Sequence, residues 1–223
     1  MGRIVVWSGG YDSTLLLTRE LMENKSITAW SIIMPGISQE KLHSEHIVRE
    51  RYKEFIAKKL PKAKIDHHEI NIGYDFFRTS PGGSFPQQAF WALFASWFAH
   101  DGDEIIFGFH RGDEFWKFYE KAGYASEYIC GIMDKQIKFL YPLKTTSKWQ
   151  IVSQINRMGL RDYVWTCEGP PIPMSVCGTC DSCANLRQAN AEIEYRIKKC
   201  KMKEPPIIID ESVSEEDVEE DSH

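Results

Sequence analysis

The first 22 residues contain a strand, a glycine turn and the beginning of a helix in direct succession. The apolar, β-branched run at residues 3–7 is typical of a buried strand. The turn Ser-Gly-Gly-Tyr-Asp-Ser-Thr occupies residues 8–14. Apolar residues at helical spacing follow it, so a helix is expected to begin near Asp12 or Ser13. The chain therefore starts with a βα unit whose turn lies beyond the carboxyl end of the strand.

This turn has the properties of an anion site. Its glycines, Gly9 and Gly10, allow a tight turn and a close approach of the backbone to a ligand. The free N–H groups at a helix start point toward bound oxyanions. Hydroxyl groups that add hydrogen bonds come from Ser8, Ser13 and Thr14. The alternative is an ordinary βα turn in which a Ser or Asp caps the helix.

The motif differs from two common phosphate-binding patterns. It contains neither G-x-x-x-x-G-K-[ST] nor G-x-G-x-x-G, which disfavours Walker-type and Rossmann-type sites. It matches S-G-G-x-D-S, and in this it resembles the PP-loop ATP pyrophosphatase superfamily. The resemblance implies an ATP site that cleaves between the α- and β-phosphates, usually to adenylate a substrate. The ATP-binding residues that it implies are Ser8, Gly9, Gly10, Tyr11, Asp12, Ser13 and Thr14, and Asp12 and Ser13 are catalytic candidates as well.

Strand-like and helical segments alternate through most of the chain. The expected strands are residues 3–7, 27–33, 64–70, 104–109 and 137–141. The expected helices are residues 12–24, 40–60, 86–100, 111–125 and 147–158. This alternation predicts an α/β fold with a doubly wound, five-stranded parallel sheet covered on both faces. Ligands of such sheets bind beyond the carboxyl ends of the strands, where the glycine turn lies.

Composition and charge narrow the class of protein. Of the 223 residues, 43% are hydrophobic, which is enough for one substantial core. The formal net charge is -5 and no long basic stripe occurs, so no nucleic-acid partner is expected. No run approaches the roughly 18 apolar residues of a membrane span. No signal-peptide pattern is present either, so we expect a cytoplasmic protein without membrane contact.

Two segments are candidates for contact with a substrate. Residues 73–88 form a loop about as long as loops become without being functional or disordered. Either its aromatic side chains, Phe85 among them, stack on a flat ring while Gln88 binds a polar edge, or it is a mobile surface excursion. The second segment follows the fourth strand and should face the glycine turn. Its candidates for substrate or magnesium contact are His110, Arg111, Asp113 and Glu114, although Asp113 is also suited to a routine helix cap.

Lys148 follows Ser147, which is the expected N-cap of the next helix. The helix dipole does not favour a cation in the first turn, so a phosphate partner explains this lysine better. We therefore place Lys148, together with Asp113, among the catalytic candidates.

Four cysteines occur close together near the end of the chain. Cys177, Cys180 and Cys183 stand at two successive C-x-x-C spacings, and Cys167 lies ten positions before Cys177. Four thiolates at knuckle-like spacing predict a closed tetrahedral structural zinc site. Redox or sulfur-carrying cysteines are the alternative. We expect an ATP-binding domain at 1–160, a zinc-binding helical segment at 161–203 and a disordered acidic tail at 204–223.

The glycine turn followed by Cys and then C-G-x-C-D-S-C resembles the QueC (ExsB-like) 7-cyano-7-deazaguanine synthases. The residues that carry the resemblance are Ser8 to Ser13, Ile105 to Asp113, Pro142-Leu143, Ser147-Lys148, Cys167, Cys177 to Cys183 and Arg187. The resemblance implies that 7-carboxy-7-deazaguanine, ammonia and ATP, with magnesium, yield the nitrile through an activated carboxylate and then an amide. It further suggests Arg187 as a substrate residue and a homodimer as the assembly.

The pattern departs from the family in three segments that line its substrate pocket, at residues 34–38, 86–88 and 113–116. A divergent homologue that acts on a related carboxylate, or stops at the amide, is therefore an alternative. PP-loop sulfur transfer to tRNA and a nucleotide-binding regulatory module without catalysis are two further hypotheses.

Overall fold

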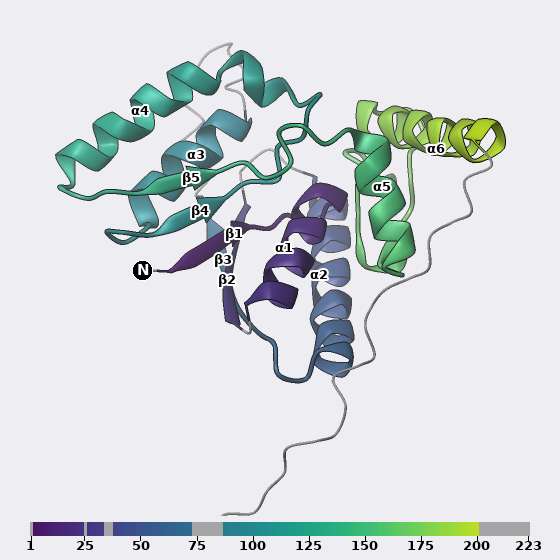
Figure 1. The fold of residues 1–223 in the computed structure, drawn as a ribbon, viewed down its shortest axis with the longest axis horizontal. Helices are drawn as coiled ribbons and strands as arrows, with labels where there is room; N and C mark the ends of the chain where they lie inside the picture. Colours follow the sequence, from purple (N-terminus) through teal and green to yellow (C-terminus); the bar gives the residue numbers. More distant parts are fainter. Residues whose placement is uncertain (1, 25, 34–37, 73–86, 201–223) are drawn as a thin grey trace, which may run out of the picture.

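The computed structural model describes residues 2–24, 26–33, 38–72 and 87–200. Its centre is one parallel sheet of five strands in the order β3-β2-β1-β4-β5 (Figure 1). The strands are β1 (Arg3–Val6), β2 (Ser26–Ile33), β3 (Lys64–Asn71), β4 (Glu104–Ile106) and β5 (Lys138–Leu140). The predicted α/β fold with a five-stranded parallel sheet is confirmed.

Helices cover both faces of this sheet (Figure 1). They are α1 (Tyr11–Glu23), α2 (Gln39–Lys59), α3 (Gln87–Phe98), α4 (Tyr119–Ile132), α5 (Lys148–Arg157) and α6 (Asp181–Cys200). Successive β1 side chains enter opposite layers, because strand side chains alternate in direction. Ile4 and Val6 join the core beneath α3 and α4, whereas Val5 and Trp7 join the core beneath α1, α2 and α5. Helix α6 lies beside α5, away from the sheet (Figure 1).

The segment after β4 differs from its prediction in two respects. The ladder of β4 ends at Ile106, so the observed strand is shorter than the predicted strand at residues 104–109. The expected helix 111–125 is also wrong at its start: a 3-10 turn at Glu114–Lys117 precedes α4. The carboxylate of Asp113 caps that turn, accepting from the N–H of Phe115 at 2.9 Å. Residues 107–113 therefore form a loop at the end of the sheet.

The order of the strands positions the site. Strand β1 lies between β2 and β4, with Val5 in register with Ile106 of β4 and Ala29 of β2. The chain leaves β1 toward β2 and returns later on the other side as β4, which is the switch point where parallel sheets bind ligands. The loops after β1 and β4 therefore lie next to each other. Within the described ranges, no helix combines the length and apolar character that a bilayer span requires.

Candidate active site and metal centre

A cavity of about 520 Å³ lies beyond the carboxyl ends of β1 and β4. This volume is within the range of cofactor-binding and substrate-binding pockets. Its lining includes these residues that the sequence singled out: Ser8, Gly10, Tyr11, Asp12, Ser13, His110, Asp113, Glu114 and Lys148. The fold thus brings together the glycine turn, the loop after β4 and the start of α5.

The glycine turn presents the start of α1 to this cavity. Gly9 has a φ of +87°, a left-handed conformation that favours glycine, and a Cβ there would lie 3.2 Å from a side-chain carbon of Val48. Gly10 is the N-cap of α1 and provides no side-chain hydrogen bond to the helix. Ser13 Oγ accepts from the N–H of Ser8 at 3.2 Å, which closes the turn. Within the part of the chain that the structure describes, no side chain therefore caps the first N–H groups of α1, as at anion-binding helix starts.

Gly108 sets the distance between the loop after β4 and α1. A Cβ at Gly108 would lie 3.0 Å from the backbone nitrogen of Ser13 and 3.2 Å from the carbonyl carbon of Asp12. Backbone atoms cannot rotate away as a side chain does, so any other residue here would push the loop off the helix start. The sequence does not predict this role, because a glycine after a strand has no distinctive pattern of its own.

Lys148 and Asp12 form the charged centre of the cavity. Lys148 Nζ donates to Asp12 Oδ2 at 2.5 Å, which joins the start of α5 to the start of α1. The other oxygen, Asp12 Oδ1, is buried and has no hydrogen-bond partner among the described residues. A buried polar atom without a partner is costly, so an unsatisfied carboxylate oxygen beside a helix start fits a site that takes a metal ion such as magnesium with phosphates.

His110 and Asp113 belong to the same lining. The N–H of Gly112 donates to His110 Nδ1 at 3.0 Å, so the proton of the neutral ring lies on Nε2. Burial lowers the pKa of His110, which keeps the ring neutral near pH 7. Burial also raises the pKa of the Asp113 carboxyl, although this carboxyl accepts a backbone hydrogen bond from Phe115. Asp113 is therefore both a helix cap and a cavity residue.

Other candidates have different positions. Thr14 is fully buried and its hydroxyl accepts from Trp7 Nε1 at 3.0 Å, so this hydroxyl serves the core. Arg111 is exposed, and Arg187 donates to the carbonyl oxygen of Gly178 at 2.5 Å beside the cysteines. Among the described residues, the lining contains none of Gly9, Thr14, Arg111 and Arg187. Phe85 and the side chain of Gln88 lie outside the described residues.

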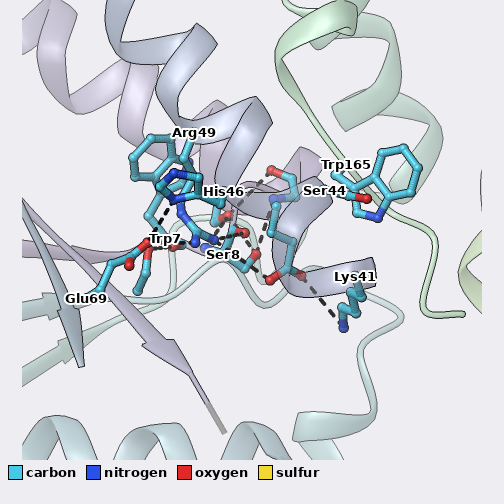
Figure 2. Close-up of polar contacts among 12 residues, drawn as sticks. Trp7, Ser8, Lys41, Ser44, His46, Arg49, Glu69 and Trp165 are labelled. Atoms are coloured by element: carbon cyan, nitrogen blue, oxygen red, sulfur yellow. Dashed lines mark hydrogen bonds and ion pairs between the residues drawn. The ribbon is translucent and has the colours of Figure 1, made fainter. Parts of the chain in front are cut away.

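The side chain of Arg49, on α2, contacts the backbone of the glycine turn (Figure 2). Its side chain is 2% exposed. Its Nη1 donates to the carbonyl oxygen of Ser8 at 3.1 Å, and its Nη2 donates to Glu69 Oε1 at 2.8 Å. Glu45 lies one turn earlier on α2, with Oε2 3.8 Å from Nη1. The sequence does not predict this role of Arg49, because a charged residue on a helix gives no sign of burial until the tertiary contacts are known.

The four predicted metal ligands form one cluster. The sulfur atoms of Cys167, Cys177, Cys180 and Cys183 all lie within 4.8 Å of one another. Four sulfurs about 2.3 Å from one tetrahedral zinc ion would be about 3.8 Å apart, so the cluster fits zinc. The N–H groups of Thr179 and Cys180 donate to Cys177 Sγ, and each nitrogen lies 3.4 Å from the sulfur. These hydrogen bonds lower the pKa of the Cys177 thiol to about 5, which favours the thiolate that binds metal.

The cysteine segment is connected to the glycine turn and to α2. The N–H of Trp165 donates to the carbonyl oxygen of Gly9 at 2.9 Å, and the N–H of Met174 donates to Ser44 Oγ at 2.8 Å. Glu168, next to Cys167, forms an ion pair with Lys41 of α2. The cysteine cluster therefore lies next to one wall of the cavity, which Trp165 and Glu168 line.

Comparison with known families supports the resemblance. Residues 95–194 match the family model of the queuosine biosynthesis protein QueC. This range includes the loop after β4, Lys148 and the four clustered cysteines, whereas the glycine turn lies outside it. No curated protein matches the chain.

The cysteine cluster predicts one zinc ion per chain. We expect elemental analysis of the purified protein to find about one equivalent of zinc, and Cys180→Ser to lose it, because a closed site needs all four thiolates. Cys130→Ser is the matched control, since Cys130 of α4 is outside the cluster, and it should keep the zinc. A protein that binds no zinc, or a Cys180→Ser variant that keeps a full equivalent, would contradict this assignment.

Proposed function

Because residues 95–194 carry a QueC-family domain, we propose that this protein is an ATP-dependent ligase of the 7-cyano-7-deazaguanine synthase type. Its substrates would be 7-carboxy-7-deazaguanine and ammonia. One observation carries the proposal: the glycine turn, which lies outside the matched range, lines the same cavity as matched residues from the loop after β4, the start of α5 and the start of α6. A nucleotide at the turn and a substrate held by the matched domain would therefore share one cavity.

The proposed chemistry converts a carboxylate to a nitrile in two activations. In the first, the carboxylate oxygen attacks the α-phosphorus of ATP, pyrophosphate leaves, and ammonia then displaces AMP and loses a proton to form the amide. In the second, the amide oxygen is activated in the same way, and loss of AMP, which carries away the amide oxygen, and of both N–H protons leaves the nitrile. Each nitrile thus consumes two ATP molecules, and each amide consumes one.

The protein contributes position and charge stabilisation. The uncapped amides at the start of α1 would bind phosphate oxygens. Asp12, with Oδ1 free of protein partners among the described residues, would bind magnesium. Lys148 would stabilise the charge that develops on the phosphates, since a fixed cation at such a site favours the transition state. His110, Asp113 and Glu114 would contact the substrate or the metal.

Sulfur transfer is supported less well. The four clustered cysteines are suited to metal binding, and sulfur transfer needs an accessible, activated thiol. The thiol of Cys130 lies outside the cluster, and burial raises its pKa. Among the five cysteines whose side chains the structure describes, none therefore combines freedom from the cluster with a lowered pKa.

The direct test is turnover. The purified protein is incubated with 7-carboxy-7-deazaguanine, ammonium and MgATP, and the products are identified by mass spectrometry. We expect 7-cyano-7-deazaguanine and AMP in a ratio of about one to two, because each activation releases one AMP. A divergent enzyme that stops at the amide would give a ratio of about one to one. ATP binding without release of AMP would overturn the proposal and favour a regulatory module.

Lys148→Met tests the role given to this lysine. We expect kcat to fall about 100-fold to 1000-fold, with the KM for the carboxylate little changed, because the cation acts mainly on charge that develops in the transition state. Lys144→Met is the matched control: Lys144 is exposed and lies 5.1 Å from the ring centre of Trp116, outside the cavity lining. Steady-state assays of AMP release check both variants. Equal kcat in the two variants would remove Lys148 from the mechanism.

A further inference from the structure

The cavity contains a cation to which no role has been given. Among the described residues, three basic side chains that carry a fixed charge line it: Lys41, Arg49 and Lys148. A charge buried in a protein needs a compensating partner, and the identity of that partner decides whether the cation is available to a ligand. The three cations differ in this respect.

Two of these cations are already paired with buried or partly buried groups of the protein. Arg49 holds the Ser8 carbonyl oxygen and Glu69, and its own side chain is 2% exposed. Its removal from these partners would release the glycine turn. Lys148 is paired with Asp12 at the nucleotide end of the cavity, and both side chains of this pair are mostly buried.

Lys41 is buried but its closest partner is not. The Lys41 side chain is 9% exposed, whereas the side chain of Glu168, with which it forms an ion pair and a hydrogen bond, is 52% exposed. The second carboxylate, that of Glu45, is 3.7 Å from Lys41 Nζ. A half-exposed carboxylate recovers its hydration when it leaves, so the contact between Lys41 and Glu168 is the cheapest of these ion pairs to exchange.

The surroundings of Glu168 favour such an exchange. Glu168 Oε1 accepts from the hydroxyl of Ser182, in the first turn of α6, at 3.3 Å. A carboxylate is stabilised near the start of a helix, so Glu168 keeps a hydrogen-bond donor when its other oxygen leaves Lys41. An incoming carboxylate would replace the negative charge of Glu168 beside Lys41 with another negative charge.

Lys41 also lies on the face of α2 that leads to the glycine turn (Figure 2). Lys41, Glu45 and Arg49 are spaced four residues apart, which places them on one helix face. Arg49 contacts the Ser8 carbonyl oxygen, so this row of charges ends at the proposed phosphate site. Trp91 and Trp165 line the same cavity and offer apolar surface for a flat ring.

We propose that the ammonium group of Lys41 binds the carboxylate of the substrate, and that Glu168 is the resident counter-ion which this carboxylate displaces. This inference rests on the proposed function, because it assumes a carboxylate substrate. It adds a binding residue and a competing side chain that the family resemblance and the family match do not name.

The test compares two ligands by calorimetry on the full zinc-loaded chain. The probes are 7-carboxy-7-deazaguanine and 7-deazaguanine, which lacks the carboxylate. We expect the wild-type protein to bind the carboxylate compound at least about tenfold more tightly, as one charge-assisted hydrogen bond allows. Lys41→Met should lose this preference and bind 7-deazaguanine as before, whereas Lys41→Arg should retain part of it. Glu168→Gln should bind the carboxylate compound several-fold more tightly, because the competing charge is gone.

The matched control is Lys53→Met on the same helix, where the lysine pairs with Glu50 and lies outside the cavity lining. It should keep the wild-type preference. If Lys41→Met weakens both ligands equally, or if Glu168→Gln weakens the carboxylate compound, the inference is overturned. If the wild-type enzyme turns over the carboxylate compound and Lys41→Met still prefers it over 7-deazaguanine as strongly as the wild type does, this inference alone is refuted. A wild-type protein that binds neither probe would refute the proposed function as well.

Discussion

The close approach of three backbone segments at the start of α1 is the constraint on which the site depends. Gly9 turns against α2, and Gly108 brings the loop after β4 against Asp12 and Ser13. A Cβ at either glycine would lie 3.0 to 3.2 Å from its nearest neighbour, too close for ordinary packing. The parallel topology makes β1 and β4 neighbours, and the two glycines let the loops that follow them share one edge of the cavity with a helix start.

A contribution to folding stability does not explain the buried ion pairs at the cavity. Buried ion pairs are expensive to desolvate and are often no more stable than apolar packing, so they are weak evidence of a stabilising role. The pairs of Lys148 with Asp12, Arg49 with Glu69 and Lys41 with Glu168 all contribute residues to the cavity lining. Their concentration at one cavity is better explained by ligand binding. The cysteine cluster helps to position one of these side chains, because Glu168 directly follows Cys167.

Local sequence patterns predicted the parts of the structure that depend on local order. The periodicity of the apolar residues predicted all five strands, and cysteine spacing predicted the four-sulfur cluster. The S-G-G-x-D-S motif predicted the turn that lines the cavity at Ser8 and Asp12.

Contacts between distant residues could not be predicted in this way. The bond from Arg49 to Ser8 joins residues 41 positions apart, and the pair of Lys41 with Glu168 spans 127 positions. Charged residues on a helix are usually solvated, so only the packing of α2 against the turn reveals these two as buried. The hydroxyl of Thr14 was expected at the ATP site, and the structure instead places it against Trp7. A sequence motif does not show whether a side chain in the first helical turn points to the ligand site or to the core.

The proposed function depends above all on the binding of nucleotide phosphates to the backbone at the start of α1. A crystal structure of the zinc-loaded protein with a non-hydrolysable ATP analogue and magnesium tests it directly. We expect phosphate oxygens within about 3 Å of backbone nitrogens between Gly9 and Ser13, with the metal on Asp12. Density for the triphosphate elsewhere in the cavity, or an empty glycine turn at saturating analogue, would contradict it.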